Sequence, residues 1–139
     1  IGGGVVINSK MYLGRGNAGE LGSCTIKYDG PKSKFNNGSL DSFISTKAIK
    51  RDYGKEPISL KSKKAWNSIG SKLGIGISNM VNALDPDVVV IGGRITGAWK
   101  FFSKKMMEAY KESGFNSGAK LVKAELEEAN VIGAASLVK

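Results

Sequence analysis

The sequence predicts an α/β fold in which a mixed sheet carries helices on both faces. Residues 4–8 and 11–14 are two short apolar runs at the start of the chain, with the alternation of paired antiparallel strands. Further along, the apolar run Val88–Ile91 lies between two long segments whose apolar residues recur at helical spacing. An antiparallel meander followed by strand-helix-strand crossover units gives a mixed sheet covered by helices.

The expected strands begin with the meander and end with parallel pairing. The first two strands meet around Asn8-Ser9-Lys10, and Ser23–Tyr28 alternates well enough to be the third. The polar residues 29–38 are rich in turn formers and predict a loop. Val88–Ile91 is apolar at every position, which predicts a fully buried, central parallel strand. Lys120–Glu125 is the expected last strand.

Four helices are expected, with the approximate bounds Ser39 to Gly54, Ser62 to Leu84, Trp99 to Gly114 and Val131 to Val138. Ser39 can cap the first helix, and Asp85-Pro86 ends the second. The second helix contains Gly70, Gly74 and Gly76, each of which weakens a helix locally by about 1 kcal/mol relative to Ala. Glycines in a buried helix therefore predict close packing against a neighbouring element.

Composition limits the class of protein. The chain has 139 residues, enough for one domain with a buried core. Its single cysteine, Cys24, excludes an internal disulfide framework and favours a reducing, cytoplasmic location. The sequence shows neither an apolar run of membrane-spanning length nor a signal peptide, so no membrane partner is expected.

The net charge of +9 raises the possibility of a nucleic-acid partner. All but three of the 21 basic residues are lysines, whereas proteins that read bases and phosphates rely strongly on arginine. The lysines are spread over several predicted helices and loops. A lysine-rich solvated surface therefore explains the charge better than a nucleic-acid interface does.

Three separated segments carry most of the functional signal. The first joins Gly2-Gly3-Gly4 to Gly14-Arg15-Gly16-Asn17-Ala18-Gly19-Glu20-Leu21-Gly22. The second is Asp85-Pro86-Asp87-Val88-Val89-Val90-Ile91-Gly92-Gly93, and the third is Ala129-Asn130-Val131-Ile132-Gly133-Ala134-Ala135. A glycine triplet can present backbone N–H groups to an anion, although alone it is also explained by a tight turn. Gly92-Gly93, taken alone, is explained equally well by a ligand-binding segment and by a turn between a strand and a helix.

In this order and at this separation, the segments resemble the C-terminal domain of the ROK family of repressors and sugar kinases. The resemblance implies a ribonuclease H-like domain of the actin-like ATPase (hexokinase) superfold. It covers nearly the whole chain, so residues 1–139 are expected to be the C-terminal domain of a larger protein whose N-terminal domain is absent from this sequence.

The resemblance implies that ATP, together with Mg²⁺, binds between two glycine segments. Gly2, Gly3 and Gly4 occupy the second half of the family's phosphate-binding turn, where backbone donors need no side chain. Gly92 and Gly93 match the family's nucleotide-binding glycines, beside which a Cβ would collide with adenosine. Arg94 departs from the pattern, because a third glycine is common at its position.

The same resemblance places a sugar near Glu20, Asn17, Ser23 and Asp41. Glu20 matches the family's acidic sugar ligand, and a carboxylate can accept hydrogen bonds from two neighbouring hydroxyls. Asp41 falls where relatives often have a second sugar-binding Glu, and its side chain is one methylene shorter. A position in the first turn of a helix explains Asp41 equally well through the helix dipole.

The zinc-binding set of the family does not match this sequence. Relatives carry a histidine and three cysteines at the positions that correspond here to Ser23, Ser33, Phe35 and Ser39. The chain contains no histidine, and Cys24 lies elsewhere. A tetrahedral nitrogen and sulfur site is therefore not expected, and the chain resembles a zinc-free branch.

The resemblance also implies that this chain holds no catalytic residue, because the family's aspartate base lies in the N-terminal domain. Phosphoryl transfer needs groups from both sides of a cleft. The sequence is thus interpreted as the C-terminal half of an ATP-dependent, glucokinase-like sugar kinase that forms a homodimer. The alternatives are a sugar-responsive regulator, in which this domain binds an effector and another part binds DNA, and an inactive remnant used for assembly.

Overall fold

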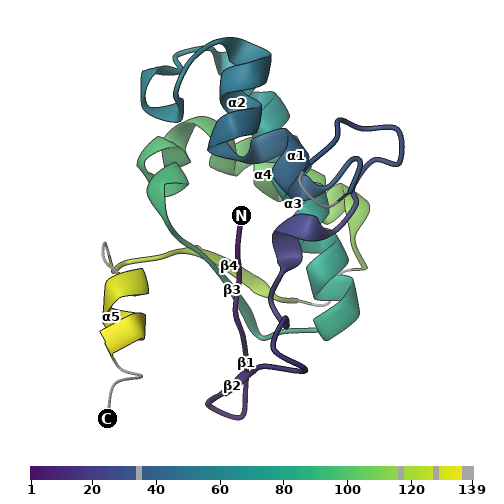
Figure 1. Cartoon of the computed structure of the whole chain (residues 1–139), viewed down its shortest axis with the longest axis vertical. Helices are drawn as coiled ribbons and strands as arrows, with labels where there is room; N and C mark the ends of the chain where they lie inside the picture. Colours follow the sequence, from purple (N-terminus) through teal and green to yellow (C-terminus); the bar gives the residue numbers. More distant parts are fainter. Residues whose placement is uncertain (34–35, 116–117, 127–128, 136–139) are drawn as a thin grey trace.

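The long helix α3 (Lys63–Leu84) lies at the centre of the structure, with the other large helix, α4 (Trp99–Ser113), packed along it (Figure 1). The short helices α1 (Leu40–Ile44) and α2 (Thr46–Tyr53) precede α3, and α5 (Ala129–Ala135) lies at the periphery. The structure is a computed structural model that describes residues 1–33, 36–115, 118–126 and 129–135.

The predicted helix from Ser39 to Gly54 is two helices. Ser39 caps α1 as expected, because its Oγ accepts a hydrogen bond from the Ser42 N–H at 3.3 Å. Ser45 then adopts extended backbone, and its Oγ accepts from the Ala48 N–H at 3.3 Å, which starts α2. Gly54 ends α2 in the left-handed conformation, with φ of 66°. A second capping serine therefore divides the predicted helix.

The glycines of α3 allow the close packing that the sequence predicts. A Cβ added to Gly70 would lie 2.5 Å from the Phe102 carbonyl oxygen, and one added to Gly74 would collide with the Met106 carbonyl oxygen. The backbones of α3 and α4 therefore touch at two points about one turn apart. Gly76 instead receives the side chain of the fully buried Leu40, which fixes α1 on another part of α3.

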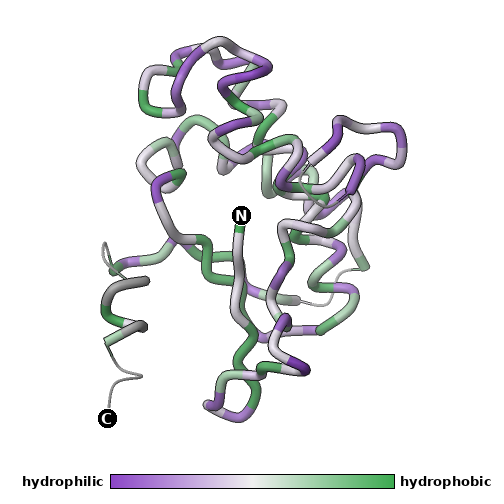
Figure 2. Tube along the Cα trace, in the orientation of Figure 1, coloured by the Kyte–Doolittle hydropathy of each residue, from purple (hydrophilic) through white to green (hydrophobic). Residues whose placement is uncertain are grey.

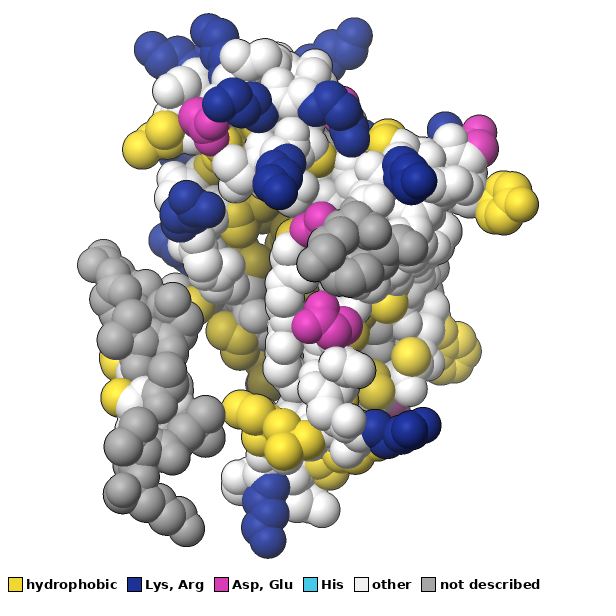
Figure 3. Space-filling model, in the orientation of Figure 1, with side chains coloured by type: hydrophobic (Ala, Val, Ile, Leu, Met, Phe, Trp, Pro, Cys, Tyr) yellow, Lys and Arg dark blue, Asp and Glu magenta, His cyan; other side chains and the backbone are white. Residues whose placement is uncertain are grey.

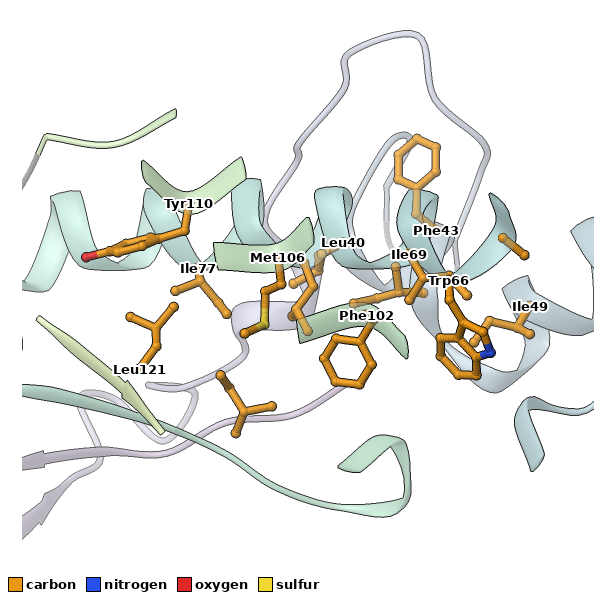
Figure 4. Close-up of a cluster of buried hydrophobic side chains, with 14 of the residues drawn as sticks. Leu40, Phe43, Ile49, Trp66, Ile69, Ile77, Phe102, Met106, Tyr110 and Leu121 are labelled. Atoms are coloured by element: carbon orange, nitrogen blue, oxygen red, sulfur yellow. The ribbon is translucent and has the colours of Figure 1, made fainter. Parts of the chain in front are cut away.

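The core continues from these contacts along α3 and α4. Figure 4 shows the buried aromatic and aliphatic side chains lying in a row between the helices. Trp66 is 1% exposed, donates its indole N–H to the Leu60 carbonyl at 2.8 Å, and stacks on Phe102 with ring centroids 6.0 Å apart. Trp99 meets Phe102 edge-on at 5.5 Å. Packing in the core is therefore the main use of Phe102.

The strands form two separate pairs within the described residues. β1 (Val5–Ile7) and β2 (Lys10–Tyr12) are antiparallel, and the turn between them places Asn8 and Ser9 at φ of 51° and 61°. β3 (Val88–Ile91) and β4 (Lys120–Lys123) are parallel. The α/β class is confirmed, but no hydrogen bonds between described residues join its antiparallel and parallel parts into one sheet.

Two further sequence predictions need correction. Ser23–Tyr28 is not a strand, because Leu21–Ser23 forms a 3₁₀ turn and only Thr25 makes an isolated bridge. β3 is not fully buried, since Val88 and Val90 are 47% and 60% exposed. A strand made only of apolar residues is usually covered on both faces. In β3 the face that carries Val88 and Val90 is exposed instead.

The remaining bounds agree closely with the prediction. β4 ends two residues before Glu125, and α5 begins two residues earlier than predicted. Residues 136–139, the end of the predicted last helix, lie outside the described residues. Within the described part of the chain, none of the helices combines the length and apolar character that crossing a membrane requires.

The contact between α3 and α4 predicts the effect of a single methyl group. Gly74→Ala should lower the free energy of unfolding by roughly 1–3 kcal/mol, because the new Cβ has no room beside α4. Asn79→Ala, on an exposed position of the same helix, is the matched control and should be close to neutral. Urea denaturation measures both. Equal stability of the two variants would contradict the close backbone contact.

Candidate functional site

An open cleft of about 1830 Å³ lies between the start of the chain and β3. Residues 1–9 form one wall, and residues 85–95, which include β3, form another. Side chains of α3 contribute to the lining, as do residues of α1 and α2. The cleft is therefore built from segments that are far apart in the sequence.

The glycine triplet presents two different sides. A Cβ added to Gly3 would lie 2.8 Å from Leu21 Cδ1 and 3.0 Å from the Gly19 carbonyl oxygen. A Cβ added to Gly2 or Gly4 would have no atom within 4 Å. Gly3 thus packs inward, while Gly2 and Gly4 leave free space beside the backbone.

The turn that contains Glu20 packs directly on this triplet. Gly19 has φ of +99°, and a Cβ there would lie 2.5 Å from the Gly3 carbonyl oxygen. A Cβ on Gly22 would collide with the Ile1 carbonyl oxygen. Segments 1–4 and 19–22 therefore lie side by side with their backbones in contact. The contact leaves no room for a side chain at Gly19 or Gly22. The turn carrying Glu20 is held next to the triplet by this contact.

Gly92 and Gly93 follow β3 on the same cleft as the triplet. Gly93 has φ of +82° and would have no atom within 4 Å of an added Cβ. A Cβ on Gly92 would make only an ordinary contact of 3.4 Å with Ala124. The open space beside Gly93 fits a ligand that approaches the backbone closely. The two predicted glycine segments therefore share one cleft.

The four predicted sugar ligands divide into two groups. Ser23 and Asp41 line the cleft, and Asp41 Oδ1 lies 2.6 Å from the backbone nitrogen of Ile1. Glu20 and Asn17 are exposed on the adjoining turn and are not among the described residues that line the cleft. Glu20 immediately precedes the 3₁₀ turn Leu21–Ser23, so its backbone lies directly beside the cleft wall.

The fold brings basic side chains from separate parts of the chain to the lining of the cleft, where acidic side chains also lie. Lys32, Lys47, Arg51 and Arg94 all belong to its lining. In Figure 3 the dark blue side chains gather over the part of the molecule that contains α2. In the sequence these residues looked like a scattered solvated surface, because only the fold brings them to one cleft. Asp41, Asp85 and Asp87 line the same cleft, so an anionic ligand would depend on local basic groups rather than on the charge of the whole lining.

Arg51 is the most firmly held of these cations. Its Nε and Nη2 donate to the two carboxylate oxygens of Asp52 at 2.6 and 2.9 Å, and Nη2 also donates to the Ser42 carbonyl at 3.0 Å. The hydrogen bond to Asp52 raises the pKa of Arg51, so this side chain stays charged. Because Asp52 neutralises part of that charge, Lys47 and Arg94 provide the more available positive groups.

The residues at the family's zinc positions do not fit a zinc ion. Ser39 Oγ serves as the cap of α1, and Ser33 Oγ donates to the Asn36 carbonyl at 2.9 Å. Phe35 lies outside the described residues. The described residues hold no group of three or more His, Cys, Asp or Glu side chains arranged for a metal. Serine hydroxyls are not the thiolate and imidazole donors that zinc prefers.

The α/β domain, with its two glycine segments on one cleft, has the fold of the actin-like ATPase class. The sequence profile of the ROK family matches residues 1–139, and the chain belongs to this family. It is 31% identical to a putative xylose repressor of Caldicellulosiruptor sp. (strain Rt8B.4), over 99% of this chain and 43% of the repressor. It is 30% identical to a glucokinase of Halalkalibacterium halodurans, over 100% of this chain and 53% of the glucokinase.

A solved structure of the same family also resembles this chain. The ROK hexokinase from Thermus thermophilus superimposes with a TM-score of 0.82 and 27% identity, over 92% of this chain and 49% of the hexokinase. The chain thus spans about half the length of these relatives. The family includes both sugar kinases and repressors, and this chain resembles members of both kinds.

The contact between the triplet and the Glu20 turn predicts different effects at two glycines. Gly19→Ala and Gly16→Ala both place alanine at positive φ, but only at Gly19 would the Cβ meet backbone. Gly19→Ala should therefore be the less stable variant, by roughly 1–3 kcal/mol relative to Gly16→Ala. Urea denaturation of both measures the difference. If the two lose the same stability, the backbone contact is not tight.

Proposed function

We propose that this chain is the C-terminal half of an ATP-dependent, glucokinase-like sugar kinase that transfers the γ-phosphate of ATP to a sugar hydroxyl. The observation that carries the proposal is that Gly2–Gly4 and Gly92–Gly93 line one cleft together with Ser23 and Asp41. A nucleotide and a sugar must meet for phosphoryl transfer, and a shared cleft supports that meeting. The 30% identity with a glucokinase over the whole chain also supports it.

The nucleotide would lie along the two glycine segments. The free space beside Gly2 and Gly4 admits a phosphate to their backbone N–H groups. Lys47 and Arg94, which line the same cleft, would add positive charge near the phosphates, and Mg²⁺ is expected to accompany ATP. The free space beside Gly93 would accept the adenosine.

The sugar would bind where the Glu20 turn meets α1. Glu20 is exposed beside the triplet, and its carboxylate can accept two hydroxyl hydrogen bonds. Ser23 and Asp41 approach from the cleft wall, and Asn17 from the exposed turn. Together these side chains can hold a polyhydroxylated ligand next to the phosphate end of a nucleotide.

The catalytic base would come from an N-terminal domain outside residues 1–139. Exposed apolar side chains on two sides of the cleft support a covering partner of this kind. Figure 2 shows apolar chain at both places, and the side chains are Val6, Ile7, Val88 and Val90. Phe101, 48% exposed on α4, is a candidate contact in a homodimer. The exposed Cys24 fits a reducing, cytoplasmic location.

The reaction itself is the first test. The intact protein should phosphorylate a hexose, an amino sugar or a related sugar with ATP and Mg²⁺ in a coupled assay. Glu20→Ala should lower kcat/KM for the sugar by roughly tenfold to a hundredfold, the range expected for lost hydrogen bonds to a charged group. Glu125→Ala, an exposed carboxylate outside the cleft lining, is the control. The kinase assignment is wrong if the wild-type protein phosphorylates none of these sugars.

A methyl group at Gly4 tests the nucleotide position separately. Gly4→Ala should raise the KM for ATP while leaving the unfolding temperature unchanged, because the added Cβ meets no atom of the protein and occupies space proposed for phosphate. Gly97→Ala, also free of neighbours and outside the cleft lining, is the matched control. An unchanged KM for ATP in Gly4→Ala would place the phosphates elsewhere.

A sugar-responsive transcriptional regulator is the second candidate. The observation that favours it is the 31% identity with a putative xylose repressor over 99% of this chain. In that case the same cleft would bind a sugar effector, and a DNA-binding segment outside residues 1–139 would read an operator. Sugar-dependent release of DNA without phosphorylation would support this candidate. An assembly remnant would bind neither ATP nor sugar in calorimetry.

A further inference from the structure

The loop that follows Tyr28 folds back onto the turn that contains Ser23. The Asn36 side chain makes the connection, because its Nδ2 donates to the Ser23 carbonyl oxygen at 2.7 Å and to Thr25 Oγ1 at 3.3 Å. These two acceptors lie 13 and 11 residues earlier in the chain. One carboxamide therefore joins two segments that have no regular secondary structure in common.

The other polar groups of Asn36 hold it in place for this role. Ser33 Oγ lies 3.1 Å from Asn36 Oδ1 and 2.9 Å from the Asn36 carbonyl oxygen, and it accepts from the Asn36 N–H at 3.2 Å. The Ser33 N–H also donates to the Asn36 carbonyl at 2.8 Å. Ser33 therefore holds the Asn36 backbone, and its single hydroxyl proton is shared between the two Asn36 oxygens, which restricts the carboxamide.

The loop is also tied to the start of α1. The Ile26 N–H donates to the Gly38 carbonyl at 2.8 Å, and the Leu40 N–H donates to the Cys24 carbonyl at 2.9 Å. The Ser23 N–H in turn donates to the Glu20 carbonyl at 3.1 Å. The Glu20–Ser23 turn is therefore tied to the loop before α1 through Asn36, and the residues that follow this turn are tied to the start of α1 by backbone hydrogen bonds.

We propose that Asn36 is a positioning residue that fixes the Glu20–Ser23 turn relative to Asp41, and that it does so without a metal ion. The inference rests on the proposed sugar site, and it follows from the misfit between this loop and zinc. A metal would join the same segments through thiolates and an imidazole, whereas here the hydroxyls of Ser33 and Ser39 already make hydrogen bonds within the protein. The hydrogen bonds of the Asn36 carboxamide make this connection between the two segments, which we call the Asn36 crosslink.

The crosslink predicts a selective kinetic effect in the intact protein. Asn36→Ala should raise the KM for the sugar about tenfold and leave the KM for ATP unchanged, since one or two lost hydrogen bonds loosen only the sugar side. Asn36→Asp, of the same size, places a carboxylate against the Ser23 carbonyl and should have the same effect. Asn37→Ala removes the neighbouring exposed carboxamide and is the control.

Hydrogen exchange measures the crosslink without relying on activity. The amides of residues 23–26 should exchange faster in Asn36→Ala and Asn36→Asp than in Asn37→Ala and the wild type. Exchange equal to that of Asn37→Ala in both Asn36 variants would refute the proposal, whatever the activity. If the wild type phosphorylates no sugar but the exchange rates change as expected, the kinase assignment fails and the crosslink stands.

Chelation tests the absence of a metal. After dialysis against dipicolinate, the wild-type protein should show unchanged exchange at residues 23–26 and an unchanged unfolding temperature. Elemental analysis should find no stoichiometric zinc. One zinc per chain, with faster exchange of these amides after its removal, would show that a metal rather than Asn36 holds the loop.

Discussion

The close contact between α3 and its neighbours is the constraint on which the rest of the structure depends. Gly70 and Gly74 bring the α3 backbone against that of α4, and Gly76 accepts the buried Leu40 from α1. Larger residues would push both partners away, because a packed core does not yield by a methyl group without loss of stability. The glycines lower the intrinsic helix propensity, and the buried surface that they allow outweighs this loss.

The position of the cleft follows from this packing. The chain ends α3 at Asp85, continues into β3 and reaches Gly92–Gly93. Helix α1, which contains Asp41, packs against another part of α3. The start of the chain is held against the turn that contains Glu20 by backbone contact between Gly3 and Gly19. Glycine therefore serves two purposes here: within α3 and at Gly3 and Gly19 it lets backbones touch, and at Gly2, Gly4 and Gly93 it leaves space.

Elements with their own local signal were predictable from the sequence. The period of α3 and the apolar run of β3 gave nearly correct bounds, and the three glycines indicated close packing. The strand prediction for Ser23–Tyr28 was wrong because the alternation is short. The hydrogen bonds that hold this segment come from a later loop and include those of Asn36. The triplet, Gly92–Gly93 and Arg94 were named from the sequence, but the presence of Lys32, Lys47 and Arg51 at the cleft was not. Their common position depends on tertiary packing, which no local pattern contains.

The proposed kinase requires one cleft to hold both a nucleotide and a sugar. A crystal structure of the intact protein with a sugar and a non-hydrolysable ATP analogue is the decisive measurement. Phosphate oxygens should lie within hydrogen-bonding distance of backbone N–H groups among Gly2–Gly4, with adenosine beside Gly92–Gly93 and sugar hydroxyls on Glu20. A nucleotide bound away from both glycine segments, or a sugar bound with the nucleotide excluded from the cleft, would contradict it.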